Sequence, residues 1–242
     1  MQKIMGYVRR AVQEFGLIDE GDKIAVGISG GKDSLVLLSA LAGMRRFEAF
    51  SYDIVAVTID PGFNGVPNNY DAVARLCDRL QVPFSLVHTQ IGEIVFDIRK
   101  EPNPCSLCAN MRRGALHDAA KAAGCNKLAL GHHNDDVIET FMMNLTKEGR
   151  IGCFSPKTHL DRKDITVIRP LVFAPESQVS AACKRNGLEV VKSVCPADKT
   201  TVRQQTKEFL ADMESRDRGV KQRIFSALRK SGIDGWGYPD RQ

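Results

Sequence analysis

The segment Ser29-Gly30-Gly31-Lys32-Asp33-Ser34 is rich in glycine and serine and lies where an expected strand meets an expected helix. Residues 23–28 are typical of a buried parallel strand, and from Asp33 to Arg46 apolar residues recur at helical spacing. Glycines let the backbone approach a phosphate closely, and the N–H groups at the start of a helix point toward an anion. The order of strand, loop and helix therefore predicts a phosphate-binding loop, in which Lys32 adds a positive charge. The spacing differs from that of a Walker A loop, and the simpler alternative is an ordinary Gly/Ser turn.

Expected strands and helices alternate through the first two thirds of the chain. The strands are expected at 23–28, 53–59, 83–88 and 126–131, and the helices at 2–15, 33–46, 68–80, 106–123 and 135–146. Such alternation predicts an α/β fold in which a doubly wound parallel sheet is covered by helices on both faces. Ligands of such a fold bind beyond the carboxyl ends of the strands. After residue 147 the pattern changes, with an irregular or hairpin-like stretch at 151–172 and added C-terminal helices expected at 175–186, 200–213 and 216–230.

The chain of 242 residues is long enough for one α/β domain with appendages. We expect a single domain over residues 1–230, followed by a terminal tail over 231–242 that is docked or mobile. The sequence has no run of about 18 apolar residues, and residues 1–16 are too polar for a signal peptide. We therefore expect a cytoplasmic protein without a membrane partner. The net charge of +5 permits an RNA partner without demonstrating one.

The seven cysteines are an odd number, which argues against a disulfide framework in such a chain. Cys77, Cys125 and Cys183 lie in expected helices or at their ends, where we expect small buried apolar side chains. Cys105 and Cys108 form a C-x-x-C motif at the start of an expected helix. Because a helix N-terminus favours negative charge, we expect the pKa of both thiols to be lowered.

A metal or cluster on Cys105 and Cys108 needs further ligands, for which the candidates are Cys153 and Cys195. Cys195 lies in an expected loop just before a proline, and this setting suits a cluster ligand. Three cysteines on an iron–sulfur cluster leave one iron open, and that iron can bind sulfide. The spacing alone leaves three alternatives: an iron–sulfur cluster, a zinc site completed by Cys153 or a histidine, and redox or structural thiols.

A second polar segment, Gly131-His132-His133-Asn134-Asp135-Asp136, follows an expected strand and begins an expected helix. Paired carboxylates beside a phosphate loop can hold Mg²⁺, so we expect Gly131, Asp135 and Asp136 to lie at Mg²⁺-bound ATP. The structural alternative is that Asn134 or Asp135 caps the helix. Asp60, at the end of the strand 53–59, either caps a turn or contacts the ribose or the adenine amine of ATP.

Several blocks of sequence occur in a fixed order. They are Ser29–Ser34, Pro104–Cys108 running into Met111-Arg112-Arg113-Gly114-Ala115-Leu116, Gly131–Asp136, Ile168-Arg169-Pro170-Leu171 and Val194-Cys195-Pro196. This arrangement resembles the tRNA 2-thiocytidine synthetase family of PP-loop (N-type ATP pyrophosphatase) enzymes, over about residues 1–215. The resemblance implies the adenine-nucleotide α-hydrolase-like fold.

The resemblance also implies an ATP-dependent tRNA sulfurtransferase that forms AMP and pyrophosphate. Such an enzyme adenylates a cytidine in the anticodon loop and replaces its oxygen with sulfur, giving 2-thiocytidine. The implied cofactors are ATP, Mg²⁺ and a 4Fe–4S cluster, with the cluster on Cys105, Cys108 and Cys195. The implied partners are tRNA, a sulfur donor such as a cysteine desulfurase or free sulfide, and a second copy of the chain in a homodimer.

Lys32, Asp135 and Asp136 are the expected catalytic residues, because Lys32 and Mg²⁺ would stabilise the departing pyrophosphate. Arg112 and Arg113 either contact tRNA phosphates or form a solvated helix face. Two other adenylating PP-loop enzymes are alternatives: a 2-thiouridine-type thiolase and a lysidine-type ligase with zinc at the cysteines. The sequence lacks N-terminal zinc-ribbon cysteine pairs, which favours the cytidine branch. A non-catalytic nucleotide-binding redox module is a further alternative, although simple binding needs no paired carboxylates.

Overall fold

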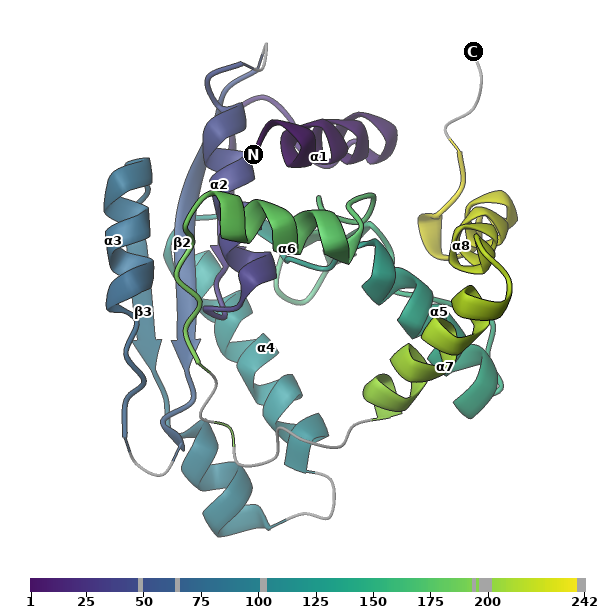
Figure 1. Ribbon diagram of the computed structural model, residues 1–242. Helices are drawn as coiled ribbons and strands as arrows, with labels where there is room; N and C mark the ends of the chain where they lie inside the picture. The colour runs from purple at the N-terminus through teal and green to yellow at the C-terminus, as the bar shows by residue number, and fades with distance from the viewer. Residues whose placement is uncertain (48–49, 64–65, 101–103, 193–194, 196–201, 239–242) are drawn as a thin grey trace.

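A mostly parallel sheet forms the centre of the protein (Figure 1). The computed structural model describes residues 1–242 except 48–49, 64–65, 101–103, 193–194, 196–201 and 239–242. Within these residues, six strands form one sheet in the order β3-β2-β1-β4-β6-β5. The strands are β1 (Asp22–Gly27), β2 (Tyr52–Asp60), β3 (Phe84–His88), β4 (Lys127–Ala129), β5 (Lys157–Leu160) and β6 (Ile165–Ile168). Neighbouring strands are parallel except β5, which pairs with β6 as an antiparallel hairpin.

The chain winds in both directions from β1, which pairs with β2 on one side and with β4 on the other. Val26 lies in register with Ala56 of β2 and Ala129 of β4. The carboxyl ends of these three parallel strands therefore meet at one edge of the sheet. This edge carries the Ser29–Ser34 segment after β1, Asp60 at the end of β2 and the Gly131–Asp136 segment after β4. The topology thus brings together three segments that are far apart in the sequence.

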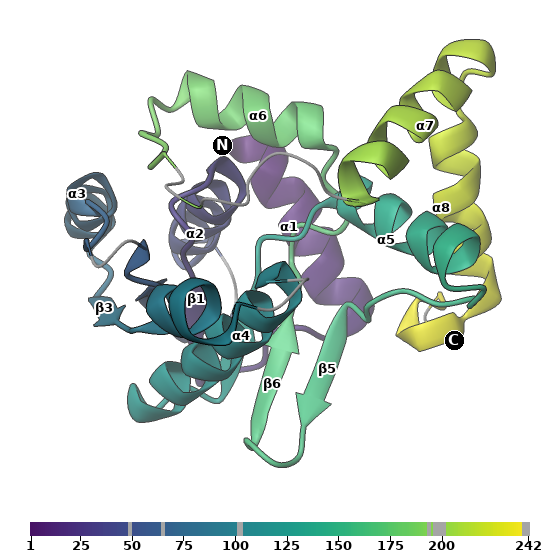
Figure 2. The ribbon, with the colours of Figure 1, turned by 90° about the horizontal axis from the view of Figure 1, so that it is seen from below.

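Helices cover both faces of the sheet (Figures 1 and 2). They are α1 (Gln2–Phe15), α2 (Lys32–Met44), α3 (Asp71–Leu80), α4 (Pro104–Ala122), α5 (Asn134–Lys147), α6 (Glu176–Arg185), α7 (Val202–Arg216) and α8 (Val220–Ser231). Ile24 and Val26 of β1 belong to a core that also contains buried residues of α1, α2 and α6. Ala25 belongs to a second core with residues of α4. Because successive side chains of a strand point to opposite faces, the two cores lie on opposite sides of the sheet. The expected doubly wound α/β fold is confirmed.

The C-terminal helices pack beside the sheet, not against it. α7 and α8 contact α5 and each other (Figure 2). After α8, the short 3-10 turn η3 (Ile233–Gly235) leads to Trp236, which is fully buried. The ring of Trp236 lies edge-on to Phe15 and Phe225, and its Nε1 donates to the carbonyl of Phe154 (2.8 Å). The tail is therefore docked as far as Trp236, whereas a domain boundary at residue 230 stays a prediction.

The hairpin-like stretch expected at 151–172 is confirmed by β5 and β6. Two local features differ from the expectation. η2 (Glu93–Arg99) is a π-helix in a stretch for which no helix is expected. α7 continues to Arg216, and α8 begins only at Val220, because its N-cap Gly219 takes the left-handed conformation (φ 86°) and so interrupts the helical path. Cys77, Cys125 and Cys183 are buried, as expected. In the part of the chain that the structure describes, no helix has the length and apolar character to cross a membrane.

Candidate active site

The Ser29–Ser34 segment, here called the phosphate loop, closes on itself between β1 and α2. Oγ of Ser34 donates to the carbonyl of Gly31 (2.9 Å) and accepts from the N–H of Ser29 (3.2 Å). Gly31 directly precedes α2 and has no side chain to cap the helix. No described side chain caps α2, so the N–H groups of its first turn can meet an anionic ligand, and phosphate binding there stays a prediction.

Gly30 of the phosphate loop contacts Val191, which lies four residues before Cys195 in the sequence. The N–H of Val191 donates to the carbonyl of Gly30 (3.0 Å). Gly30 has a φ of 80°, and a Cβ added there would lie 2.7 Å from Cβ of Val191. A side chain at this position would be strained by both the backbone conformation and the contact. The contact therefore requires glycine.

Gly131 makes a second close approach between loops. A Cβ added to Gly131 would lie 3.1 Å from the backbone of Asp33 and Ser34. The absence of a side chain lets the loop after β4 lie directly against the start of α2. This places the Gly131–Asp136 segment beside the phosphate loop, as expected for a shared nucleotide site.

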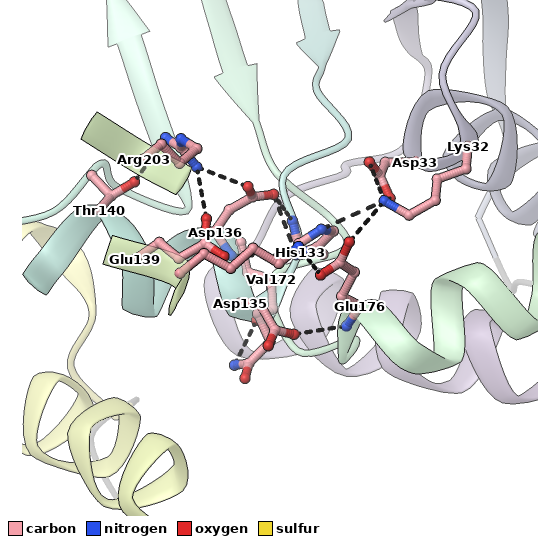
Figure 3. A network of polar contacts seen from close by, with 12 residues as sticks. Lys32, Asp33, His133, Asp135, Asp136, Glu139, Thr140, Val172, Glu176 and Arg203 are labelled. Carbon is pink, nitrogen blue, oxygen red and sulfur yellow. Dashed lines mark hydrogen bonds and ion pairs between the residues drawn. The ribbon is translucent and has the colours of Figure 1, made fainter. Parts of the chain in front are cut away.

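The ammonium of Lys32 is held between two carboxylates (Figure 3). Nζ of Lys32 lies 3.1 Å from Oδ1 of Asp33 and 3.1 Å from Oε1 of Glu176, the first residue of α6. Partial burial lowers the pKa of Lys32, but the two carboxylates outweigh burial, so the pKa is raised. Lys32 is therefore protonated at neutral pH and offers a positive charge at the loop.

The two aspartates of the second polar segment lie in different surroundings (Figure 3). Oδ1 of Asp136 accepts from Arg203 of α7 (2.9 Å), and Oδ2 accepts from the N–H of His133 (2.9 Å). Oδ2 of Asp135 accepts from the N–H of Glu176 (2.7 Å), and Oδ1 accepts from Lys221 of α8 (3.3 Å). Asp135 thus ties α5 to α6 and α8.

The helix cap differs from the expectation that Asn134 or Asp135 caps α5. The N-cap is His133, whose Nδ1 accepts from the N–H of Asp136 (3.3 Å) in a reciprocal capping box. Asn134 is already the first helical residue, and its side-chain amide donates to the carbonyl of Val172 (3.2 Å). Histidine is an uncommon cap, so composition points to the Asn and Asp residues instead.

A cavity of about 430 Å³, here called the nucleotide cavity, opens at the carboxyl edge of the sheet. Its polar end is lined by Ser29, Asp33, Ser34, Gly131, His132 and Asp136, and α4 contributes Arg112, Arg113 and Leu116. Side chains of β2 and β4 form an apolar wall. Asp136 lines this cavity, whereas Asp135 is not among its lining residues. A polar end beside a phosphate loop and an apolar wall suit a nucleotide.

His132 packs its ring against Phe154, with centroids 4.9 Å apart. Burial, followed by the charge of Arg169, lowers the pKa of His132 well below its ordinary value. A neutral imidazole therefore lines the nucleotide cavity at physiological pH, and it adds no charge to repel or attract phosphate.

A second cavity of about 210 Å³, here called the cysteine cavity, adjoins the first. Its lining residues include Cys195, Lys192, Tyr70 and Asp60, and it shares Ser29 and Arg112 with the nucleotide cavity. The two cavities therefore meet at the phosphate loop and α4.

Asp60 caps a turn, which is one of the two roles expected for it. It is 1% exposed, and its carboxylate accepts from the N–H groups of Gly62 and Asn68 (both 3.2 Å). His88 Nδ1 lies 3.1 Å from Oδ2 of Asp60. Because Asp60 lines the cysteine cavity and not the nucleotide cavity, its contact with the ribose or adenine stays a prediction.

The three candidate cluster ligands lie on α4 and against the core that α4 helps to form. Cys105 is exposed near the start of α4, Cys108 is buried one turn later, and Cys195 is half-buried against the same core as Cys108. Burial raises the pKa of the Cys108 thiol, and the nearby Cys195 and Cys105 raise it further, while Arg112 opposes the rise. The expectation that the helix N-terminus lowers both pKa values is therefore wrong for Cys108, because desolvation outweighs the helix dipole.

Cys153 lies apart from this group. It is buried in the core on the other face of the sheet, where its Sγ lies 3.5 Å from the carbonyl of Val137. Burial raises the pKa of Cys153 to about 12, so the thiol stays protonated. Over the described ranges, no group of three or more His, Cys, Asp or Glu side chains is arranged to hold a metal ion.

Sequence reasoning missed the residues that surround the aspartates and Lys32. Glu176 and Lys207 (α7) are 2.7 Å apart, Arg203 reaches Asp136, and Lys221 reaches Asp135. They come from three helices after residue 175, and no local motif marks them. Of these residues, only Glu176 has a position that the sequence marks, because it is an acidic residue at the start of a helix. Acidic residues are typical of helix starts in general, so this position does not indicate a site.

Comparison with known proteins identifies the family. The model of the PP-loop domain family matches residues 4–213. A tRNA-cytidine(32) 2-sulfurtransferase from Geobacter sulfurreducens is 39% identical over 230 residues, which cover 94% of this chain and 89% of the relative. The chain belongs to the tRNA 2-thiocytidine synthetase family of PP-loop proteins. A second relative of the same name, from Pelobacter propionicus, is 40% identical over 224 residues. The match covers 91% of this chain and 82% of the relative.

A solved structure extends the family likeness to three dimensions. The U34-tRNA thiolase NcsA from Methanococcus maripaludis, determined with its [4Fe-4S] cluster, matches with a TM-score of 0.76 and 26% identity. The match covers 93% of this chain and 76% of that one. Membership of the PP-loop family confirms both the expected fold and the expected ATP-binding domain.

Proposed function

We propose that this PP-loop protein is an ATP-dependent tRNA sulfurtransferase that converts a cytidine of the anticodon loop to 2-thiocytidine. The observation that carries the proposal is the junction of the two cavities at Ser29 and Arg112. Ser29, Asp33 and Ser34 of the phosphate loop line one cavity, and Ser29, Gly31 and Cys195 line the other. Activation by ATP and replacement by sulfur need such adjoining sites. The names of the relatives point to cytidine 32 as the base.

The first step that we propose is transfer of AMP. The 2-oxygen of the cytidine attacks the α-phosphorus of ATP, the bond to the bridging oxygen breaks, and pyrophosphate leaves with the electron pair. Negative charge grows on the departing pyrophosphate, and the positive charge of Lys32 lies at the loop where this charge would be held. The N–H groups at the start of α2 would add hydrogen bonds to the same phosphates.

The second step is displacement of AMP by sulfide. Sulfur attacks carbon 2 of the activated base, and the oxygen leaves with AMP. We propose that Cys105, Cys108 and Cys195 hold a cluster, because Cys108 and Cys195 contact one core and Cys105 lies one turn before Cys108 on α4. A 4Fe–4S cluster on these residues would supply an iron at which sulfide binds. A cysteine desulfurase or free sulfide is the proposed sulfur source.

The described carboxylates fit Mg²⁺ through Asp136 better than through Asp135. Asp136 lines the nucleotide cavity, and its Oδ1 contacts Arg203, which is partly exposed. Asp135 is bonded to the backbone of Glu176 and to Lys221, just as Asp136 is bonded to the backbone of His133 and to Arg203, so the cavity lining is what separates the two carboxylates. We therefore propose that Asp136 contributes a ligand to Mg²⁺ on ATP, and that Asp135 holds α5 against α6 and α8.

A second candidate function is thiolation of uridine, because the matching solved structure is a U34-tRNA thiolase. The sequence relatives at 39–40% identity favour cytidine over this candidate.

An in vitro assay separates these functions. Cluster-reconstituted protein is incubated with ATP, Mg²⁺, sulfide and unmodified tRNA, and the released AMP and the nucleosides are measured. The proposal predicts tRNA-dependent AMP and 2-thiocytidine. A 2-thiouridine product would support the second candidate, and ATP binding without AMP would support a non-catalytic module.

A further inference from the structure

Glu176 connects the phosphate loop to α7 through both oxygens of its carboxylate. Oε1 lies 3.1 Å from Nζ of Lys32, and Oε2 lies 2.7 Å from Nζ of Lys207. The two ammonium groups come from helices that are separated by most of the chain. The Glu176 side chain is only 26% exposed. Burial acts to raise the pKa of its carboxyl, but the bonds from Lys207 and Lys32 outweigh burial and lower the pKa to about 2.

The backbone of Glu176 is fixed as well as its side chain. Pro175 precedes α6 in an extended conformation, and the N–H of Glu176 donates to Oδ2 of Asp135 (2.7 Å). The first N–H groups of a helix need partners outside the helix, and Asp135 supplies one. A carboxylate in the first helical turn is also stabilised by the helix dipole. Glu176 therefore has little freedom to move.

From this arrangement we propose that Glu176 is a positioning residue for Lys32, and that Lys207 acts through Glu176. An ammonium has three N–H donors. Asp33 and Glu176 accept from Lys32 among the described residues, which leaves one donor for a phosphate oxygen of ATP. A lysine already held in this orientation loses little side-chain freedom when it binds phosphate. Protein kinases hold their phosphate-binding lysine with a glutamate for the same physical reason.

Lys207 offsets the negative charge that Glu176 alone would place beside the phosphate loop. A carboxylate beside the phosphate loop repels the phosphates of ATP and cancels part of the charge of Lys32. The bond from Lys207 offsets the negative charge of Glu176, so that Glu176 orients Lys32 while the positive charge of Lys32 stays available. This inference rests on the proposed function only in assuming that Lys32 faces the phosphates of ATP.

The test is a double-mutant cycle on Glu176→Gln and Lys207→Met in the cluster-reconstituted full chain. Pyrophosphate release with saturating tRNA gives kcat, and calorimetry gives the Kd of Mg²⁺-ATP without tRNA. We expect Glu176→Gln to lower kcat about tenfold to 100-fold, because Lys32 is no longer aligned with the leaving group. The Kd should change less than about threefold, since lost orientation and lost repulsion oppose each other. Lys207→Met should lower kcat in the wild-type background and have almost no effect once Glu176 is Gln.

Two further variants keep the test specific. Lys207→Arg retains the cation and should keep kcat near wild type. Glu208→Gln removes a neighbouring exposed carboxylate of α7, which accepts from Nε2 of Gln204 (2.8 Å), and should leave kcat unchanged. Additive effects of the two substitutions, or a Glu176→Gln enzyme with normal kcat, would overturn the inference. A wild-type protein that binds no Mg²⁺-ATP would instead contradict the proposed function.

Discussion

Nη1 of Arg203 lies 2.9 Å from Oδ1 of Asp136, so a residue of α7 reaches a carboxylate that lines the nucleotide cavity. The same nitrogen lies 3.4 Å from Oε2 of Glu139, and Nη2 donates to Oγ1 of Thr140 (3.3 Å). One guanidinium therefore joins α7 to three residues of α5 (Figure 3). In the sequence, α7 follows Cys195, which is one of the proposed cluster ligands.

Replacement of Arg203 by Met should weaken the packing of α7 on α5. Burial raises the pKa of Glu139, followed by the effect of Asp136, while Arg203 opposes both. Loss of Arg203 leaves a buried carboxylate without this partner. Because Arg203 is 42% exposed, we expect a discounted loss of about 1–2 kcal/mol in the free energy of unfolding, measured with urea.

The matched control for Arg203→Met is Arg216→Met, on the same helix. Arg216 pairs with Asp212 on the surface, with side chains that are 77% and 50% exposed. An exposed pair of this kind contributes below about 0.5 kcal/mol. Equal losses of stability in the two variants would contradict the role given to Arg203.

Replacement of Lys32 by Ala should stop catalysis without unfolding the protein. Lys32 is partly exposed and its main contacts are ion pairs, so the cluster content should match wild type and the unfolding midpoint should fall only slightly, through the lost pair with Glu176. The rate of pyrophosphate release should fall about 100-fold to 1,000-fold, as for other groups that stabilise charge in a transition state. Lys121→Ala removes an exposed lysine bonded to Asp164 and should turn over normally. Normal turnover of Lys32→Ala would exclude the phosphate loop from catalysis.

Substitution of single cysteines should separate the cluster ligands from the core thiols. Cys105→Ala, Cys108→Ala and Cys195→Ala should each lose the cluster and the thiolation activity, measured as iron and acid-labile sulfide per chain. Cys153→Ala should retain both, because Cys153 is buried on the other face of the sheet. A full cluster in Cys195→Ala would remove Cys195 from the ligand set, and a lost cluster in Cys153→Ala would redraw the site.

The stability contributed by Glu176 should depend on pH in one direction. Its bonds with Lys207 and Lys32 outweigh burial and lower the pKa from 4.5 to about 2. A group whose pKa is lower in the folded state stabilises the fold above its unfolded pKa and loses that effect as pH falls through its folded pKa. The difference in unfolding free energy between wild type and Glu176→Gln should therefore be constant above about pH 5 and shrink toward pH 2. A difference that is unchanged at pH 2 would contradict the pairing.

Local sequence was sufficient to predict the parts of the site that are built from consecutive residues. The phosphate loop, the C-x-x-C motif and the Gly131–Asp136 segment each combine a strand end or helix start with chemically distinctive residues. The alternation of strands and helices places them at one edge of a parallel sheet. The fold and the neighbourhood of these motifs therefore follow from patterns within about twenty residues of each motif.

The electrostatic partners could not be predicted in the same way. Glu176, Arg203, Lys207 and Lys221 are ordinary charged residues of helices, and their roles come from tertiary contacts between helices. The same holds for the division of labour between Asp135 and Asp136, which adjoin in sequence but face different helices. For Cys108, the helix start predicts a lowered pKa, and the core around it reverses the sign.

The most direct test of the proposed function is the nucleoside content of tRNA from a strain that lacks the gene. We predict that 2-thiocytidine disappears, that the wild-type gene restores it, and that a Cys105→Ala gene does not. An unchanged level of 2-thiocytidine, measured by mass spectrometry in the deletion strain, would contradict the proposed function, and any other nucleoside lost from the tRNA would identify the true product.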